Sequence, residues 1–210
     1  MGRRSDDVVE QQWRRVGDLD LSPILSAALD VFCEHGFYGT TVREIARRVG
    51  QTVPALYYHH DSKEGMLVAL LELSTSDLHR RVRAAAEGAG DAPAARLACV
   101  VEAIVLHMTV RSKMAALDPE TRHLSADNRK RYAARRKDIE SLMVEIIESG
   151  VRRGEFVAPE PDETARALLG MCQSIGRWYR PEGTLRPREL ADRYAGIALR
   201  AVGAEHRVGE

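Results

Sequence analysis

The sequence has few cysteines, and they are poorly placed to bond to one another. Cys33, Cys99 and Cys172 lie far apart along the 210 residues and form no C-x-x-C pair. Disulfide frameworks and structural zinc sites are recognised in sequences by closely and regularly spaced cysteines. The sequence therefore predicts neither feature. Unpaired thiols fit a reducing compartment, so we expect the protein to be cytoplasmic.

The chain also lacks an excess of charge of either sign, because 31 Lys and Arg residues balance 31 Asp and Glu residues. A protein that binds a polyanion through its overall charge carries a basic excess. Any affinity for nucleic acid must therefore come from a local patch of side chains.

Long apolar runs are missing as well. The longest unbroken run covers residues 66–71, whereas spanning a bilayer takes roughly 18 apolar residues. The N-terminus is polar and has no apolar core of the kind found in signal peptides. We therefore expect neither export nor a membrane partner.

Aromatic residues make up only 5% of the chain, and runs of β-branched residues are scarce. The abundant Ala, Leu, Arg and Glu residues favour helix. With 44% hydrophobic and 30% charged residues, the composition is that of a folded globular protein. The sequence therefore predicts an all-α fold.

Motifs that mark enzymes and cofactor sites are not found. The sequence contains no G-x-S-x-G, H-E-x-x-H, G-x-x-x-x-G-K-[ST] or G-x-G-x-x-G. His59, His60 and Asp61 are adjacent, but neighbouring residues on a helix point about 100° apart and do not converge on one ion. We therefore predict no enzyme activity, no cofactor and no metal.

Capping residues predict three short helices in the N-terminal third. A Ser-Pro step starts the first helix. Thr41 and Glu44 form a capping box for the second, and Thr52 caps the third. The predicted helices cover residues 22–36, 42–49 and 53–59. The short connection between the last two is typical of a helix-turn-helix.

The sequence pattern in the rest of the chain predicts longer amphipathic helices. Apolar stripes predict them over residues 63–87, 97–108, 125–153, 163–179 and 187–202. We expect three parts: a mobile N-terminal tail (1–21), a helix-turn-helix DNA-binding domain (22–65) and a ligand-binding and dimerisation domain (66–210). A helix that is apolar on two sides needs two partners, so we expect the last two helices to pair with those of a second copy in a four-helix bundle of a homodimer.

Residues 40–63 have side chains suited to contact DNA. In a helix-turn-helix the second helix enters the major groove, while groups around it contact the phosphate backbone. The predicted phosphate contacts are Thr41, Arg43, Tyr57, His59 and Lys63. The residues placed to reach base edges are Gln51, Thr52, Val53, Ala55 and Tyr58.

Part of this region is specific enough to indicate a family. Residues 36–50 read GFYGTTVREIARRVG, residues 52–59 read TVPALYYH and residues 61–64 read DSKE. These segments resemble the TetR family of bacterial transcriptional repressors. The resemblance implies the same phosphate contacts and adds Pro54 to the base-facing set. Two positions depart from the family pattern: Gln51 replaces the usual Val, and His60 replaces a Phe that usually packs against the next helix.

The C-terminal region carries a second resemblance. Residues 170–183, GMCQSIGRWYRPEG, and 190–199, LADRYAGIAL, are similar to the ends of family members that respond to acyl-CoA thioesters of lipid or steroid breakdown. The candidate ligand-binding residues are His107, Tyr132, Met171, Ser174, Arg177 and Trp178. For His107, Tyr132 and Trp178 the competing interpretation is packing in the core.

The predicted function is sequence-specific repression of transcription from a palindromic operator, with double-stranded DNA as the partner. Release would follow binding of a small apolar effector, with an acyl-CoA as the candidate. One alternative is a TetR-type regulator of an efflux system that responds to aromatic or cationic drugs. Two others are a helical ligand-binding module without DNA specificity and a nonspecific architectural DNA binder, against which the balanced charge counts.

Overall fold

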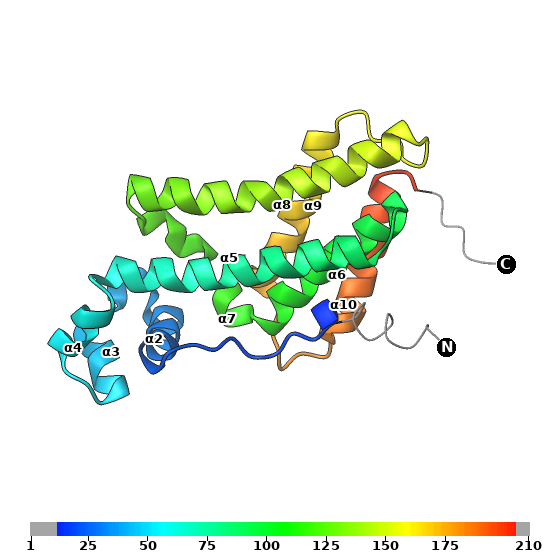
Figure 1. Ribbon diagram of the computed structural model, residues 1–210. Helices are drawn as coiled ribbons and strands as arrows, with labels where there is room; N and C mark the ends of the chain where they lie inside the picture. The colour runs from blue at the N-terminus through cyan, green and yellow to red at the C-terminus, as the bar shows by residue number, and fades with distance from the viewer. Residues whose placement is uncertain (1–11, 205–210) are drawn as a thin grey trace, which may run out of the picture. The chain divides into compact units, whose positions relative to one another are not determined.

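The computed structural model describes residues 12–204, and every regular element in that range is helical (Figure 1). The predicted all-α fold is confirmed. The α-helices are α2 (Pro23–Gly39), α3 (Val42–Val49), α4 (Val53–His59), α5 (Lys63–Gly88), α6 (Pro93–Val110), α7 (Ser112–Ala115), α8 (Ala126–Arg152), α9 (Pro161–Trp178) and α10 (Pro187–Ala201). Two short 3-10 helices are η1 (Gln12–Arg14) and η2 (Asp118–His123).

The chain divides into two compact units, and α5 and α8 each belong partly to both. One unit, which we call the head, comprises Gly17–Ser76 and Lys113–Arg135. The other, which we call the body, comprises Met1–Val16, Asp77–Ser112 and Arg136–Glu210, of which residues 12–204 are described.

Side-chain caps start the three helices of the head where the sequence places them. The hydroxyl of Ser22 accepts the N–H of Leu25 at 3.3 Å, and that of Thr41 accepts the N–H of Glu44 at 3.2 Å. Thr52 caps α4 in the same way. Each cap satisfies a backbone donor that a helix start otherwise leaves unpaired. The prediction ends the first helix three residues too early, because α2 continues to Gly39 across a bend at Gly36.

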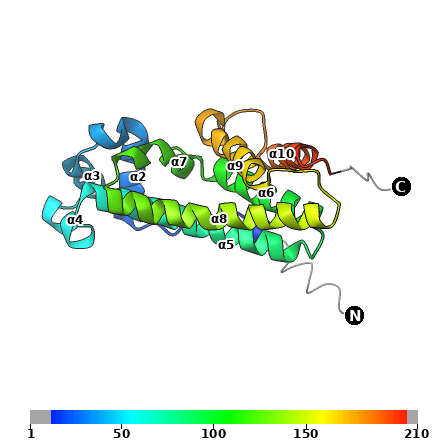
Figure 2. The same ribbon diagram turned by 90° about the horizontal axis from the view of Figure 1, so that it is seen from above.

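The core of the head draws on both of its chain segments. It includes the large, fully buried side chains Phe32, Ile45, Leu56, Met66, Leu67 and Leu70, and also Met114, Leu117 and Leu124. Complete burial of one such side chain is worth about 1.5–3 kcal/mol. These contacts tie α2, α3 and α4 to the start of α5. Figures 1 and 2 show these helices gathered at the beginning of α5.

Residues 113–135 join the head, which differs from the boundary at residues 65 and 66 that the sequence suggests. The carboxylate of Glu64 accepts the backbone N–H of Ser125 at 2.7 Å and the side-chain amide of Asn128 at 2.8 Å. Farther along α5, Glu72 pairs with Arg131 at 2.8 Å. These partners are about sixty residues apart in sequence, so no local pattern predicts them.

In the body, α6 is surrounded by protein and packs against α9 and α10 (Figure 2). Among the described residues it is the one helix long and apolar enough, by length and composition, to cross a membrane. However, 67% of that stretch is buried inside the protein. Such burial is typical of the core helix of a globular unit.

The start of the described chain is packed, although the sequence predicts a mobile tail over residues 1–21. Residues 1–11 lie outside the described part. The Trp13 side chain is only 6% exposed, and Arg14 forms a two-pronged ion pair with Glu102, with distances of 2.7 and 2.9 Å. Arg81 donates to the carbonyl oxygens of Trp13 and Arg15. One tryptophan among mixed charges gives no periodic signal, which is why the sequence does not predict this packing.

Candidate nucleic-acid interface

Helix α4 exposes most of its surface and is held by one buried side chain. Leu56 is fully buried, whereas Tyr57 is 45% and Tyr58 is 87% exposed. The other predicted contacts on this helix are Thr52, Pro54 and His59, which are exposed, and Val53 and Ala55, which are partly buried. A tyrosine as exposed as Tyr58 contributes little to the stability of the fold. Large exposed apolar side chains of this kind mark interaction surfaces.

Helix α3 presents three arginines, and two of them are engaged within the head. Arg47 pairs with Glu44 at 2.7 Å. Arg48 pairs with both Glu34 of α2 and Glu44. These hydrogen bonds lower the pKa of the two carboxyl groups, Glu34 through Arg48 and Glu44 chiefly through Arg47.

Arg43 differs from these two arginines. It is exposed and has no ion-pair partner among the described residues. Thr41, at the start of the same helix, is exposed as well, and its hydroxyl caps the helix. The start of α3 therefore offers a free guanidinium next to the positive end of a helix dipole, an arrangement that suits a phosphate.

Lys63 lies at the same surface, but its amine is engaged by the backbone. Nζ donates to the carbonyl oxygens of Phe37 and Thr40 at 2.5 and 2.8 Å and lies 4.3 Å from the centre of the Phe37 ring. Burial lowers the pKa of this amine. Lys63 thus ties the start of α5 to the turn between α2 and α3, and its role as a phosphate contact stays a prediction.

His60 occupies the position where the family usually has a buried Phe. The side chain is partly buried, and its backbone N–H closes α4 by donating to Leu56. Burial and the neighbouring His59 lower the pKa of His60. The substitution leaves α4 and its connection to α5 intact.

A group of residues that the sequence did not predict holds the turn before α3. Glu120 of η2 accepts the backbone N–H of Phe37 at 3.1 Å. The His123 ring stacks on that of Phe37 and meets Tyr38 edge-on, with centroids 5.3 and 4.3 Å apart. The one local signal was Tyr38, an aromatic residue between two glycines, which remains 80% exposed.

The predicted ligand residues are divided between the two units. Met171, Ser174, Arg177 and Trp178 share α9, where Trp178 is 42% exposed. Tyr132 belongs to the head, where its hydroxyl donates to Asp118 at 3.1 Å. Their assignment to a ligand stays a prediction.

His107 lies in the interior of the body beside a buried carboxylate. It is 2% exposed, and Nδ1 is 3.7 Å from Oδ2 of Asp77. Burial, partly offset by Asp77, lowers the pKa of His107. Burial alone would raise the pKa of Asp77, but hydrogen bonds from His107, Arg81 and Arg111 outweigh it and hold that pKa well below its usual range. Within the described residues, no three His, Cys, Asp or Glu side chains are grouped to hold a metal ion.

Helix α4 is short and exposed and follows the capped helix α3, and the chain has a second helical unit. These features define a helix-turn-helix DNA-binding regulator. Residues 24–70 match the family described as bacterial regulatory proteins, tetR family. Residues 90–202, more than half of the chain, match the family described as tetracyclin repressor-like, C-terminal domain. The chain belongs to the TetR family. It is a TetR-type transcriptional repressor and not an enzyme, and proteins of this class bind operator DNA as dimers and respond to small-molecule effectors.

Similar proteins cover nearly the whole chain. The transcriptional repressor KstR2 of Rhodococcus jostii is 30% identical over 204 residues, which are 96% of this chain and 97% of that protein. The structure of the ketosteroid transcriptional regulator KstR2 of Mycobacterium tuberculosis is 26% identical with a TM-score of 0.79, covering 91% of this chain and 100% of that one. The crystal structure of AibR in complex with isovaleryl coenzyme A and operator DNA is 25% identical with a TM-score of 0.76, covering 87% and 97%.

Proposed function

We propose that this repressor reads its operator through α4. Thr52, Val53, Pro54, Ala55 and Tyr58 face the base edges, and Thr41, Arg43, Tyr57, His59 and Lys63 contact the phosphates. The observation that carries this assignment is the exposure of α4, in which Leu56 alone is fully buried and Tyr58 is 87% exposed. Hydroxyl groups and small apolar groups at the start of a helix suit hydrogen bonds to bases and contacts with thymine methyl groups.

The operator is a near-palindrome read by a homodimer. Two α4 helices related by a two-fold axis would read half-sites about 34–36 Å apart on one face of the duplex. Dimerisation uses α9 and α10, where Trp178 is 42% and Ile197 is 39% exposed. The repressor acts in the cytoplasm, where bacterial DNA is found.

The effector is an acyl-CoA formed during lipid or steroid breakdown. The similarity to AibR, whose structure holds isovaleryl coenzyme A and operator DNA, and to KstR2 supports this ligand class. The candidate residues are His107, Tyr132, Met171, Ser174, Arg177 and Trp178. The effector releases DNA if it binds preferentially the conformer that cannot hold both half-sites, with a coupling of about 1–3 kcal/mol.

Titration of duplexes from the DNA that flanks the repressor's own gene tests this proposal. We expect one duplex to bind far more tightly than a scrambled control of equal length. A matching acyl-CoA should weaken that binding by about 5–150-fold. Affinity that does not depend on the DNA sequence would indicate an architectural DNA binder. A failure to bind any duplex would indicate a module without DNA specificity. Release by an aromatic or cationic drug, with no effect of acyl-CoAs, would place the protein among efflux regulators.

A further inference from the structure

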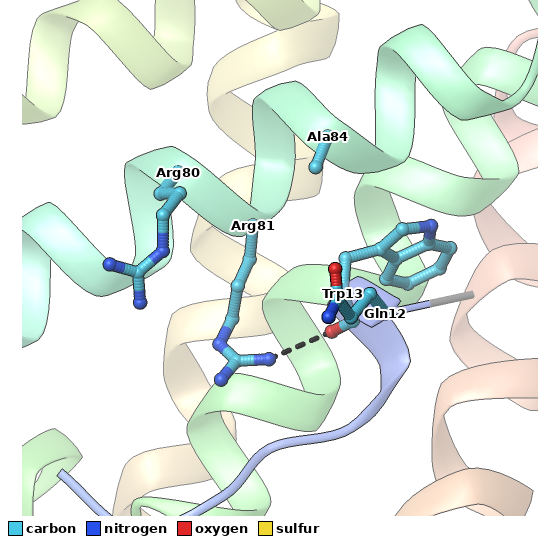
Figure 3. Close-up of a pocket in the computed structure, with 5 residues that line it drawn as sticks. All are labelled: Gln12, Trp13, Arg80, Arg81 and Ala84. Carbon is cyan, nitrogen blue, oxygen red and sulfur yellow. Dashed lines mark hydrogen bonds between the residues drawn. The ribbon is translucent and has the colours of Figure 1, made fainter. Parts of the chain in front are cut away.

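A pocket of about 240 Å³ lies in the body between η1 and the middle of α5 (Figure 3). It is lined by Gln12, Trp13, Arg80, Arg81 and Ala84. None of these residues belongs to α3 or α4, or to the effector candidates. Among the described residues, the lining contains two arginines and no acidic side chain.

The positive charge of the pocket exceeds what the buried carboxylate behind it can neutralise. Asp77, with a side chain only 2% exposed, pairs with Arg80, with Arg81 at 3.0 Å and with Arg111 at 2.9 Å. One carboxylate therefore serves both of the arginines that line the pocket. Arg14, which lies next to Trp13, is paired with Glu102 and does not add to the excess.

Part of each arginine fork remains available on the pocket side. Arg81 uses Nε for Asp77 and Nη1 for the carbonyl oxygens of Trp13 and Arg15, and its Nη2 has no partner among residues 12–204. Arg80, whose side chain is 73% exposed, uses Nη2 for Asp77. Its Nε and Nη1 have no partner in the same part of the chain. The open donors do not share one edge of either guanidinium, so each arginine can give single charge-assisted hydrogen bonds to a carboxylate.

The remaining wall of the pocket consists of Trp13, Ala84 and the polar side chain of Gln12. Figure 3 shows the indole of Trp13 on the side near Ala84, with Arg80 and Arg81 extending from the preceding turn of α5. The indole is rigid because it is 6% exposed and the Arg14 guanidinium lies 4.5 Å from its ring centre. Only a narrow strip of this fixed ring faces the pocket, and together with the two guanidinium groups it suits the edge of a small ring that carries one negative charge.

We propose that this pocket binds a small aryl carboxylate, with the carboxylate on Arg80 and Arg81 and the ring against Trp13. Ligand pockets for drug-sized molecules have volumes of about 300–1,000 Å³, so a pocket of this size takes a single ring. The ligand chemistry differs from that of a large thioester. The site is therefore independent of the proposed effector.

Binding of benzoate, followed by the indole N–H resonances in two-dimensional NMR, tests the proposal. The chain has two tryptophans, Trp13 and Trp178, and a Trp178→Phe variant assigns the two signals. We expect benzoate to shift the Trp13 signal with a dissociation constant on the order of 1 mM, as is usual for so small a ligand. The Trp178 signal should stay in place.

Substitutions on one face of α5 supply the control. Arg80→Gln should weaken benzoate binding at least tenfold, whereas Arg83→Gln, on the same helix but outside the pocket, should leave it unchanged. A Trp13 signal that does not shift when benzoate is added would overturn the proposal. So would an equal response to benzyl alcohol, which has the ring without the charge, or unchanged binding by Arg80→Gln. The experiment contains no DNA, so its failure is distinguishable from failure of the operator assignment.

Discussion

The carboxylate of Glu120 accepts the backbone N–H of Phe37 at 3.1 Å, so that η2 holds the end of α2 within the head. The bend at Gly36 interrupts the regular hydrogen bonding of α2 at this point. Glu120 therefore supplies an acceptor close to the bend. The geometry of the turn into α3 depends on a residue more than eighty positions away.

We expect Glu120→Ala to lower the free energy of unfolding by about 1.5–3 kcal/mol, the usual worth of a hydrogen bond to a charged group. Operator affinity should fall too, because the turn that positions α3 loosens. Glu120→Gln keeps an oxygen acceptor and should retain most of the stability. Urea unfolding and operator titration of both variants measure these effects. Equal losses in the two variants would show that the charge of Glu120, and not its bond to Phe37, matters.

Arg43 and Arg48 provide a matched pair, because both lie on α3 and only Arg48 is in an ion pair. Arg43→Gln should weaken binding to all duplexes and reduce the slope of log affinity against log salt by about 2, since the homodimer loses one phosphate contact in each subunit. Arg48→Gln should leave that slope unchanged. Fluorescence anisotropy at several salt concentrations gives both slopes. A reduced slope for Arg48→Gln alone would reverse the assignment.

The base-facing and phosphate-facing sides of α4 should respond differently to substitution. Thr52→Ala and Tyr58→Ala should change which base pairs are preferred, each altered position by about 1–3 kcal/mol. Tyr57→Phe should instead weaken binding to all sequences alike. Thr52→Ser keeps the cap of α4 and separates an effect on the helix from an effect on base reading. Affinities for an operator library show the pattern, and a uniform loss from Thr52→Ala would contradict it.

Stability should fall as the pH is lowered from neutral, and His107 should account for part of the loss. Its pKa is lowered in the folded state by burial, whereas in the unfolded chain it titrates near about 6.5. Between these two values only the unfolded chain binds the proton, so the folded state is penalised. His60, whose pKa is lowered as well, acts in the same direction. His107→Gln should therefore have a flatter dependence of unfolding free energy on pH below about 6.5. A steeper dependence in the variant would show instead that Asp77 keeps His107 charged, and an unchanged one would show that folding does not shift the pKa of His107.

The helices and the caps that start them could largely be predicted from the sequence because their signals are local. Thr41 and Thr52 lie next to the helices they cap, and both helices begin and end where expected. By contrast, the packing of Trp13 and the contacts of Glu120 join residues that are distant in the chain. Such pairs leave no periodic pattern. The addition of residues 113–135 to the head depends on distant contacts of the same kind.

Helix α4 has seven residues, and a helix this short is unstable on its own in water. The packing of Leu56 in the core of the head keeps α4 helical. Genetic screens for derepressed mutants should therefore recover changes at interior positions such as Ile45 and Leu56 alongside changes at the surface. Such alleles would silence the regulator without altering a single side chain that meets the duplex.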